Sequence, residues 1–176
     1  MMAVAITATS GFAQATSKMM SDTGKSYVEY FMSHPLHDWE GTSKDVKGVI
    51  VVDNNTKEIK QTAIAIKVST FDSHNANRDS HMMEATDAIK FPDVTFASNS
   101  IQKNDQGQET VTGNLTFHGV THAVTVPIDV KTDSNGEMEV TGNFAVKMTD
   151  YKIDPPSLLG MAADDNIKLK LDLFFK

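Results

Sequence analysis

The feature that most constrains the fold is a period-two alternation of apolar and polar residues that recurs along most of the chain. It is clearest over residues 138–148, where Met, Val, Gly, Phe, Val and Met alternate with Glu, Thr, Asn, Ala and Lys. Because successive side chains of a β-strand point to opposite faces, such a segment predicts a strand with one apolar face. The same alternation occurs in Thr62–Val68, Val111–Phe117, Val124–Val130 and Ile167–Phe175.

Weaker strand candidates and short turns complete this pattern. The candidates are Ser26–Met32, Lys44–Val52 and Asp93–Ser98, and turn-forming residues occupy 53–55, 104–107, 118–119 and 133–136. About eight strands joined mostly by tight turns predict an antiparallel meander. A sheet of that length exposes two unpaired edges unless it closes on itself. We therefore expect an all-β, antiparallel up-and-down barrel of eight strands.

Two longer segments interrupt the alternation. Asn75–Ala88 contains good helix formers, with Asn and Asp near its start that suit helix capping, so we expect a short helical connection over one mouth of the barrel. The second segment, Ser157–Asn166, follows two prolines and predicts an irregular loop. Together these segments are the expected gate of the barrel.

Composition excludes several classes of protein. The chain has 176 residues, a net charge of −7 and no cysteine, and Arg78 is its single arginine. One domain is expected at this length, and disulfides, thiolate metal sites and cysteine nucleophiles are excluded. An isoelectric point near 5.2 argues against a nucleic-acid partner. No apolar run is long enough for a transmembrane helix.

The N-terminal residues predict export. Residues 1–15 are small and apolar and end in Ala13-Gln14-Ala15, an A-x-A cleavage pattern, so we interpret 1–15 as the remnant of a signal peptide. The alternative is an Ala/Thr-rich terminus with no targeting role. Residues 16–24 are expected to form a polar lead-in, and 25–176 the barrel domain.

The predicted inward face consists mainly of small and branched residues, with few aromatic side chains. Such a lining leaves room for an apolar guest, although the same side chains could also meet as a packed core. The candidate lining residues are Ile64, Ile66, Leu115, Phe117, Val126, Ile128, Phe144, Val146, Leu169 and Leu171.

Three motifs resemble the YceI-like family. Asn75–Met82 is similar to its N-x-x-R-D-x-H-L signature, Phe91–Ser98 to its Y-P-x-I-x-F-x-S strand, and Gly113–Thr121 to its G-x-L-T-I-H-G-V-T hairpin. The resemblance extends from about Ser26 to the C-terminus. It implies a lipocalin-like barrel that binds a long isoprenoid or another lipid chain, that is exported to the periplasm and that catalyses no known reaction.

Polar residues near the expected mouth are candidates for contact with a lipid head group: His34, His37, Trp39, Arg78 and His81. The guanidinium of Arg78 could clamp a phosphate or carboxylate. We favour a structural role instead, an ion pair with Asp79 or Asp87. Trp39 could pack on an acyl chain or plug the floor of the barrel. His118 is interpreted as a structural turn residue.

Catalysis and metal binding find little support in the sequence. His34 and His37 are three residues apart in an extended segment, so a shared metal would require a bend at Pro35. No nucleophile, zinc or phosphate-loop motif occurs, and we expect no cofactor, no metal and no enzymatic activity. The sequence therefore predicts a carrier or store for one long-chain isoprenoid or fatty lipid. A hydrolase or isomerase using His34, His37 and Asp38, and a structural module with a filled core, remain alternatives. The oligomeric state is left open, with a homodimer among the alternatives.

Overall fold

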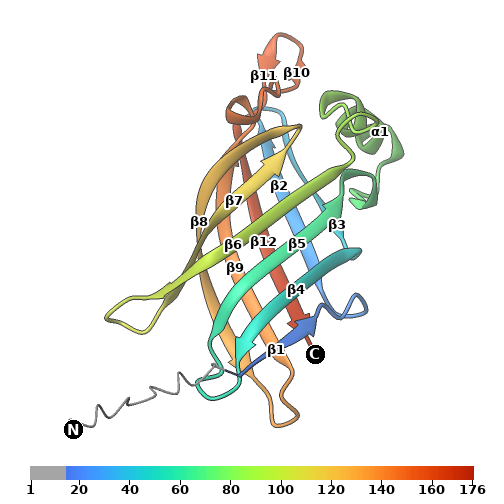
Figure 1. The fold of residues 1–176 in the computed structure, drawn as a ribbon. Coiled ribbons are helices and arrows are strands. Elements are labelled where there is room, and N and C mark those ends of the chain that lie inside the picture. Colours follow the sequence, from blue (N-terminus) through green and yellow to red (C-terminus); the bar gives the residue numbers. More distant parts are fainter. Residues whose placement is uncertain (1–14) are drawn as a thin grey trace, which may run out of the picture.

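The computed structural model describes residues 15–176. Its main feature is one antiparallel sheet that curls into an incomplete barrel (Figure 1). Its ten strands lie in the order β1-β4-β5-β6-β7-β8-β9-β12-β2-β3. The strands are β1 (Thr16–Met20), β2 (Tyr27–His34), β3 (His37–Ser43), β4 (Val46–Asp53), β5 (Ile59–Lys67), β6 (Asp93–Lys103), β7 (Glu109–Phe117), β8 (Val120–Thr132), β9 (Met138–Lys147) and β12 (Asn166–Phe175).

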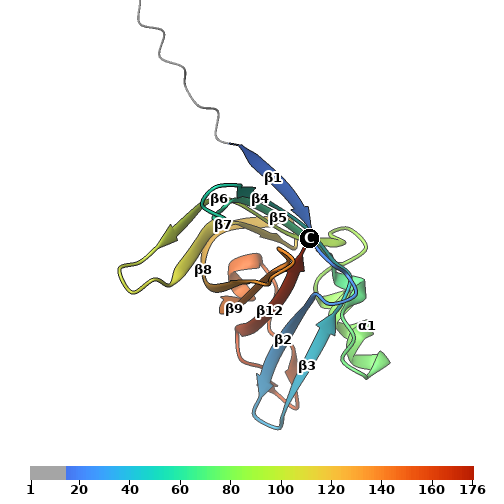
Figure 2. The same ribbon diagram turned by 90° about the horizontal axis from the view of Figure 1, so that it is seen from below.

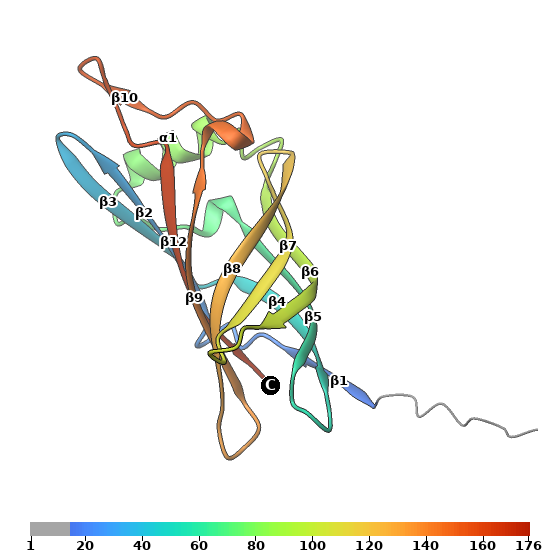
Figure 3. The same ribbon diagram turned by 90° about the vertical axis from the view of Figure 1, so that its left-hand side faces the viewer.

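Short elements occupy the connections. They are η1 (Val68–Thr70), α1 (Ala76–Ala85) and η2 (Thr149–Tyr151), together with a separate two-stranded hairpin of β10 (Ser157–Leu158) and β11 (Met161–Ala162). Helix α1 and the β10–β11 hairpin lie at one end of the barrel, which we call the mouth end (Figures 1 and 3). The C-terminus lies toward the opposite end, which we call the closed end.

Backbone hydrogen bonds join the first strand to the last at the closed end. Met20 and Lys176 exchange two bonds of 2.9 and 3.0 Å, and the Asp22 N–H donates to the Phe174 carbonyl over 2.7 Å. The pairing of β12 with β2 ends at Asp172, and beyond that residue β12 bonds to the segment that follows β1. The strands therefore run around a central space when the barrel is viewed from below (Figure 2).

The predicted fold class is confirmed: an all-β antiparallel barrel with one short helical connection. The strand count differs from the expected eight, because β1 and β3 lie where the sequence shows no clear alternation. The segment 16–24, expected to be a polar lead-in, begins with β1, which pairs with β4 from Thr16 opposite Asp53 to Met20 opposite Val49. The predicted signal peptide falls almost entirely on residues 1–14, outside the described residues.

The expected helical connection forms as α1. The Asn75 side chain accepts hydrogen bonds from the N–H groups of Asn77 and Arg78, at 3.1 and 3.2 Å, and so caps the helix as its sequence predicts. The helix buries none of its side chains. It is therefore held to the barrel by its ends and by a few partly buried contacts.

Candidate functional site

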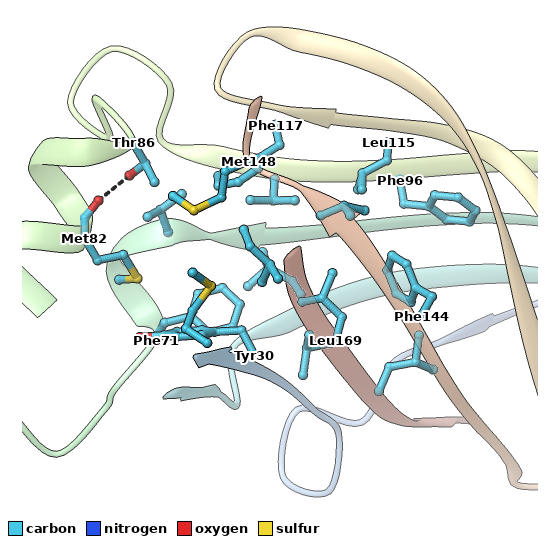
Figure 4. A pocket seen from close by; sticks show the side chains of 18 of the residues that line it. Tyr30, Phe71, Met82, Thr86, Phe96, Leu115, Phe117, Phe144, Met148 and Leu169 are labelled. Atoms are coloured by element: carbon cyan, nitrogen blue, oxygen red, sulfur yellow. Dashed lines mark hydrogen bonds between the residues drawn. The ribbon is translucent and has the colours of Figure 1, made fainter. Parts of the chain in front are cut away.

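A cavity of about 650 Å³ occupies the interior of the barrel. Its wall is formed by inward-facing side chains of β2, β4–β9 and β12, and α1 and the β10–β11 segment border it at the mouth end. Figure 4 shows part of this lining, in which Leu115, Phe144 and Leu169 approach one another from different strands. The alternation in the sequence produces this wall, because it directs one apolar set of side chains inward.

The structure places all ten predicted lining residues on the cavity wall: Ile64, Ile66, Leu115, Phe117, Val126, Ile128, Phe144, Val146, Leu169 and Leu171. They come from β5 and from four consecutive strands of the sheet, β7, β8, β9 and β12. Whether they contact a ligand stays a prediction.

Large side chains that the sequence argument missed also line the cavity. Tyr30, Phe71 and Phe96 contribute aromatic rings, and Met82 and Met148 contribute thioethers (Figure 4). The expectation of few inward aromatics was therefore wrong. Tyr30 and Phe96 lie in segments whose alternation is weak, whereas Phe71 and Met82 lie in the interruption between β5 and β6, where period two gives no information.

Even with these large side chains, the barrel retains an interior space. A volume of about 650 Å³ falls within the range of small-molecule sites, roughly 300–1,000 Å³. Cavities lined by apolar side chains offer water few hydrogen-bond partners and favour apolar guests. A structural module with a filled core is therefore not what the chain forms.

All five predicted rim residues border the cavity at the mouth end: His34, His37, Trp39, Arg78 and His81. The Arg78 guanidinium carbon lies 6.0 Å from the centre of the Trp39 ring, and Arg78 Nη1 donates to the Ser73 carbonyl over 3.4 Å. Trp39 therefore lies at the mouth and not at the floor.

The expected ion pair of Arg78 with Asp79 or Asp87 does not form. Asp79 instead accepts hydrogen bonds from the Ser73 N–H and hydroxyl, at 3.2 and 2.6 Å. Within residues 15–176, Arg78 makes no ion pair with any carboxylate. The only guanidinium of the chain thus borders the apolar cavity, and no carboxylate of the described residues lies within ion-pair distance of it.

His34 and His37 come together because β2 and β3 form a hairpin that turns at Pro35-Leu36. Their ring centres are 5.6 Å apart, and the His37 ring lies 5.3 Å from that of Trp39. The proline bend thus brings the two rings to the same face. The His34 ring, however, accepts a bond from the Leu36 N–H at Nδ1 (3.1 Å) and donates from Nε2 to the Met161 carbonyl (2.9 Å).

These contacts remove His34 as the general base of the proposed catalytic cluster. Both nitrogens of His34 are engaged by backbone groups, and Asp38 accepts a 2.5 Å bond from Ser33 on the outer side of the hairpin. A general base needs a free ring nitrogen and an acid that orients it. The structure also contains, within the residues it describes, no group of three His, Asp or Glu side chains that could hold a metal ion.

His118 has the structural role that its position in a tight turn indicates. His118 and Gly119 adopt φ angles of 50° and 71° in the two-residue turn between β7 and β8. Two successive positive φ angles are typical of the turns that match strand twist. The His118 Nδ1 atom forms a 2.9 Å bond with the Tyr151 carbonyl, which fixes η2 against this turn.

Tyr30 provides a neutral phenol inside the cavity. Burial, followed by the nearby charge of Asp79, raises the pKa of Tyr30 to about 12. Its ring crosses directly over Gly41 on β3, where an added Cβ would lie 2.5 Å from the ring. The glycine therefore makes room for this aromatic side chain below the mouth.

A comparison of the sequence with known protein families supports the same type of fold. The sequence profile of the YceI-like domain matches residues 20–175, almost all of the described chain. The chain belongs to the YceI-like family. The family resemblance read from the three motifs is thereby confirmed.

Relatives of this YceI-like chain include curated proteins of enterobacteria. Protein YceI of Salmonella newport is 31% identical over 157 residues, which cover 82% of this chain and 80% of the relative. A UPF0312 protein of Yersinia enterocolitica is 30% identical over 166 residues, covering 92% of this chain and 78% of the relative.

Solved structures share the fold of the YceI-like chain. BcnA of Burkholderia cenocepacia superposes with a TM-score of 0.77 at 22% identity, covering 88% of this chain and 98% of that one. A polyisoprenoid-binding domain from Saccharophagus degradans, implicated in plant cell wall breakdown, superposes with a TM-score of 0.70 at 12% identity, covering 92% and 99%. At these identities the likeness shows the shared fold alone. Residues 15–176 include no helix that is long and apolar enough to span a membrane.

Proposed function

We propose that this protein binds one long-chain apolar lipid, a polyisoprenoid or a similar amphiphile, inside the barrel and carries or stores it in the cell envelope. The observation that carries the proposal is the apolar cavity of about 650 Å³. Transfer of a hydrocarbon chain from water to such a wall is favourable by about 25 cal/mol per Å² of apolar surface buried. Membership of the YceI-like family and the polyisoprenoid-binding structural neighbour support this choice of ligand class.

The polar end of the ligand would remain at the mouth. Arg78, His37 and His81 border the cavity there, and Arg78 forms no ion pair with an acid within residues 15–176. A phosphate or carboxylate head group would supply that partner through charge-assisted hydrogen bonds. The deeper wall offers a ligand mainly aliphatic and aromatic contacts, so the apolar chain would point toward the closed end.

We also propose that the protein is exported, on the basis of its N-terminal residues. Residues 1–15 would act as the remnant of a signal peptide that delivers the barrel to the periplasm. Mass measurement of the mature protein isolated from its native host tests this. Cleavage after Ala15 supports export, and an uncleaved cytoplasmic product contradicts it.

The binding proposal is tested by filling the cavity. Leu169→Trp adds bulk at the middle of the wall (Figure 4) and is expected to weaken binding of a fluorescent long-chain fatty probe at least tenfold. The matched control is Lys168→Trp, one residue earlier on β12, where the side chain points to solvent. Equal probe binding by both variants, with both folded by circular dichroism, would contradict an internal site.

A further inference from the structure

Two hairpin tips at the mouth end present leucine side chains to solvent. Leu36 lies at the turn between β2 and β3 and is 50% exposed, while Leu158 and Leu159 lie at the end of the β10–β11 hairpin and are 48% and 82% exposed. We call these three residues the leucine tips. Large apolar side chains gathered on neighbouring loops are a common mark of an interaction surface.

The two hairpins are fixed side by side. The His34 Nε2 atom donates to the Met161 carbonyl over 2.9 Å, and the Asp164 N–H donates to the Ser33 carbonyl over 2.8 Å. Both bonds link the end of β2 to the β10–β11 segment, and that hairpin projects beyond the barrel (Figures 1 and 3). The leucine tips therefore face outward from one end of the molecule.

Leu159 occupies a backbone conformation that does not suit leucine. Leu159 and Gly160 have φ angles of 53° and 79°, a two-residue turn in which Asn and Gly are strongly preferred at the first position. A bulky residue there is strained, and its side chain gains no burial in return. Packing within the described residues therefore gives no reason for a leucine at this position.

The leucine tips are continuous with the interior of the barrel. Pro156, Ser157 and Leu158 line the cavity, and Leu158 is at the same time half exposed on the outer surface. No charged residue occurs from 155 to 163. An uncharged path thus runs from the cavity wall to the outermost residue of the hairpin.

We propose that the leucine tips insert into the surface of a lipid bilayer and so bring the mouth of the cavity to the membrane with which it exchanges its ligand. This inference rests on the proposed lipid-binding function. A stable protein partner would engage about 20–30 residues on each side, far more than two hairpin tips offer. The net charge of −7 opposes anionic surfaces, so the bilayer favoured is zwitterionic.

Flotation of the full chain with phosphatidylcholine vesicles tests the proposal. Leu159→Asn replaces the exposed leucine by a residue that accepts the positive φ, so thermal stability is expected to stay equal or rise. Vesicle partitioning is expected to fall roughly tenfold, and a further Leu36→Ser substitution is expected to lower it again. Met20→Asn is the control, because Met20 is 60% exposed at the closed end.

The outcomes separate this proposal from the binding function. A fluorescent fatty probe measured without vesicles reports the cavity, and Leu159→Asn is expected to bind it as the unmodified chain does. Loss of vesicle partitioning with retained probe binding supports docking through the leucine tips. Probe binding without any vesicle partitioning by the unmodified chain overturns docking and leaves the cavity function intact. Equal loss in Leu159→Asn and Met20→Asn, or self-association through the hairpin, also overturns it.

Discussion

The closed end and the mouth end of the barrel are built from the same strands but packed in different ways. At the closed end, aliphatic side chains such as Val46, Ile50 and Val52 form a continuous buried cluster around Phe175. At the mouth end, the second buried cluster includes Tyr30, Tyr151 and Ile153, and the elements that border it include α1, which buries no side chain. Backbone bonds between Met20 and Lys176 close the ring only at the first of these ends.

This difference separates stability from ligand access. An end with deeply buried side chains and a closed hydrogen-bond network holds the strands in register. The mouth end is covered by α1, which has no buried side chains, and by the β10–β11 hairpin, whose strands are two residues each. Few contacts therefore need to break before this end opens. We therefore expect stability to depend on the closed end, and ligand entry and selectivity to depend on the mouth end.

The same substitution at both ends should give the largest contrast. Phe175→Ala removes a ring that is 1% exposed and is expected to lower the free energy of unfolding by about 3–5 kcal/mol. Phe71→Ala removes a half-buried ring that packs edge-on against Tyr30 at 5.6 Å and should cost clearly less. Urea denaturation measures both. Equal losses would show that the two ends are equally packed.

Crowding at the mouth can be introduced without touching the closed end. In Gly41→Ala the new methyl group would overlap the Tyr30 ring, and we expect a loss of about 1–3 kcal/mol with altered probe affinity. In a Tyr30→Leu background the same change at Gly41 should cost much less, because the ring is gone. Additive losses in the double variant would indicate that the two residues do not interact.

The charge at the mouth should distinguish ligands by their head groups. Arg78→Gln is expected to weaken binding of a long-chain carboxylate probe roughly tenfold, the size of one lost charge-assisted hydrogen bond. Binding of the matching long-chain alcohol should change little, because its head group carries no charge. Fluorescence titration of both probes gives the comparison. An equal effect on both would assign Arg78 a structural role alone.

The smallest expected effects are two pH dependences of opposite sign. At the mouth end, Asp165 accepts bonds from the Thr149 hydroxyl (2.7 Å) and N–H (2.9 Å), which lower the pKa of its carboxyl group. Its stabilising contribution is present above the pKa of the unfolded chain, about 4, and is lost as the pH falls through the lower folded value. Asp165→Asn should therefore lower the melting temperature near neutral pH and change it little in strong acid.

On β12, burial and the charge of Glu139 raise the pKa of Asp172, whose Oδ1 atom is buried without a hydrogen-bond partner. A raised carboxyl pKa means that the ionised form destabilises the folded chain near neutral pH, and that this cost disappears as the pH falls through the folded pKa. Asp172→Asn should therefore raise the melting temperature near neutral pH only. Melting curves across the acid range measure both variants, and shifts of the same sign would contradict this assignment.

The sequence predicted the fold class and the cavity wall where period two is strict. Leu169 and Leu171 on β12 and Val126 and Ile128 on β8 lie inward as expected, because alternation alone decides the face. Neither β1 nor β3 could be found in this way. Strand β3 has the sequence HDWEGTS, and its strand character comes from pairing with β2 and not from its own pattern.

The sequence predicted which residues border the mouth, but it did not predict the contacts that these residues make. The rim residues could be named from polarity and from the family resemblance, whereas the partners of Arg78 and His34 depend on tertiary geometry. Asp79 is adjacent to Arg78 in sequence, yet it bonds to Ser73, since neighbouring residues on a helix point in different directions. Phe71 and Met82 reach the cavity from segments without regular periodicity, so only the folded chain reveals them.

Native mass spectrometry of the purified chain, with organic extraction of whatever it carries, shows whether a lipid occupies the barrel. We expect a single long-chain lipid bound to each barrel, either retained through purification or taken up one to one from an added polyprenyl alcohol. A chain that stays at its bare mass after incubation with that alcohol and with long-chain fatty acids would contradict an internal lipid site.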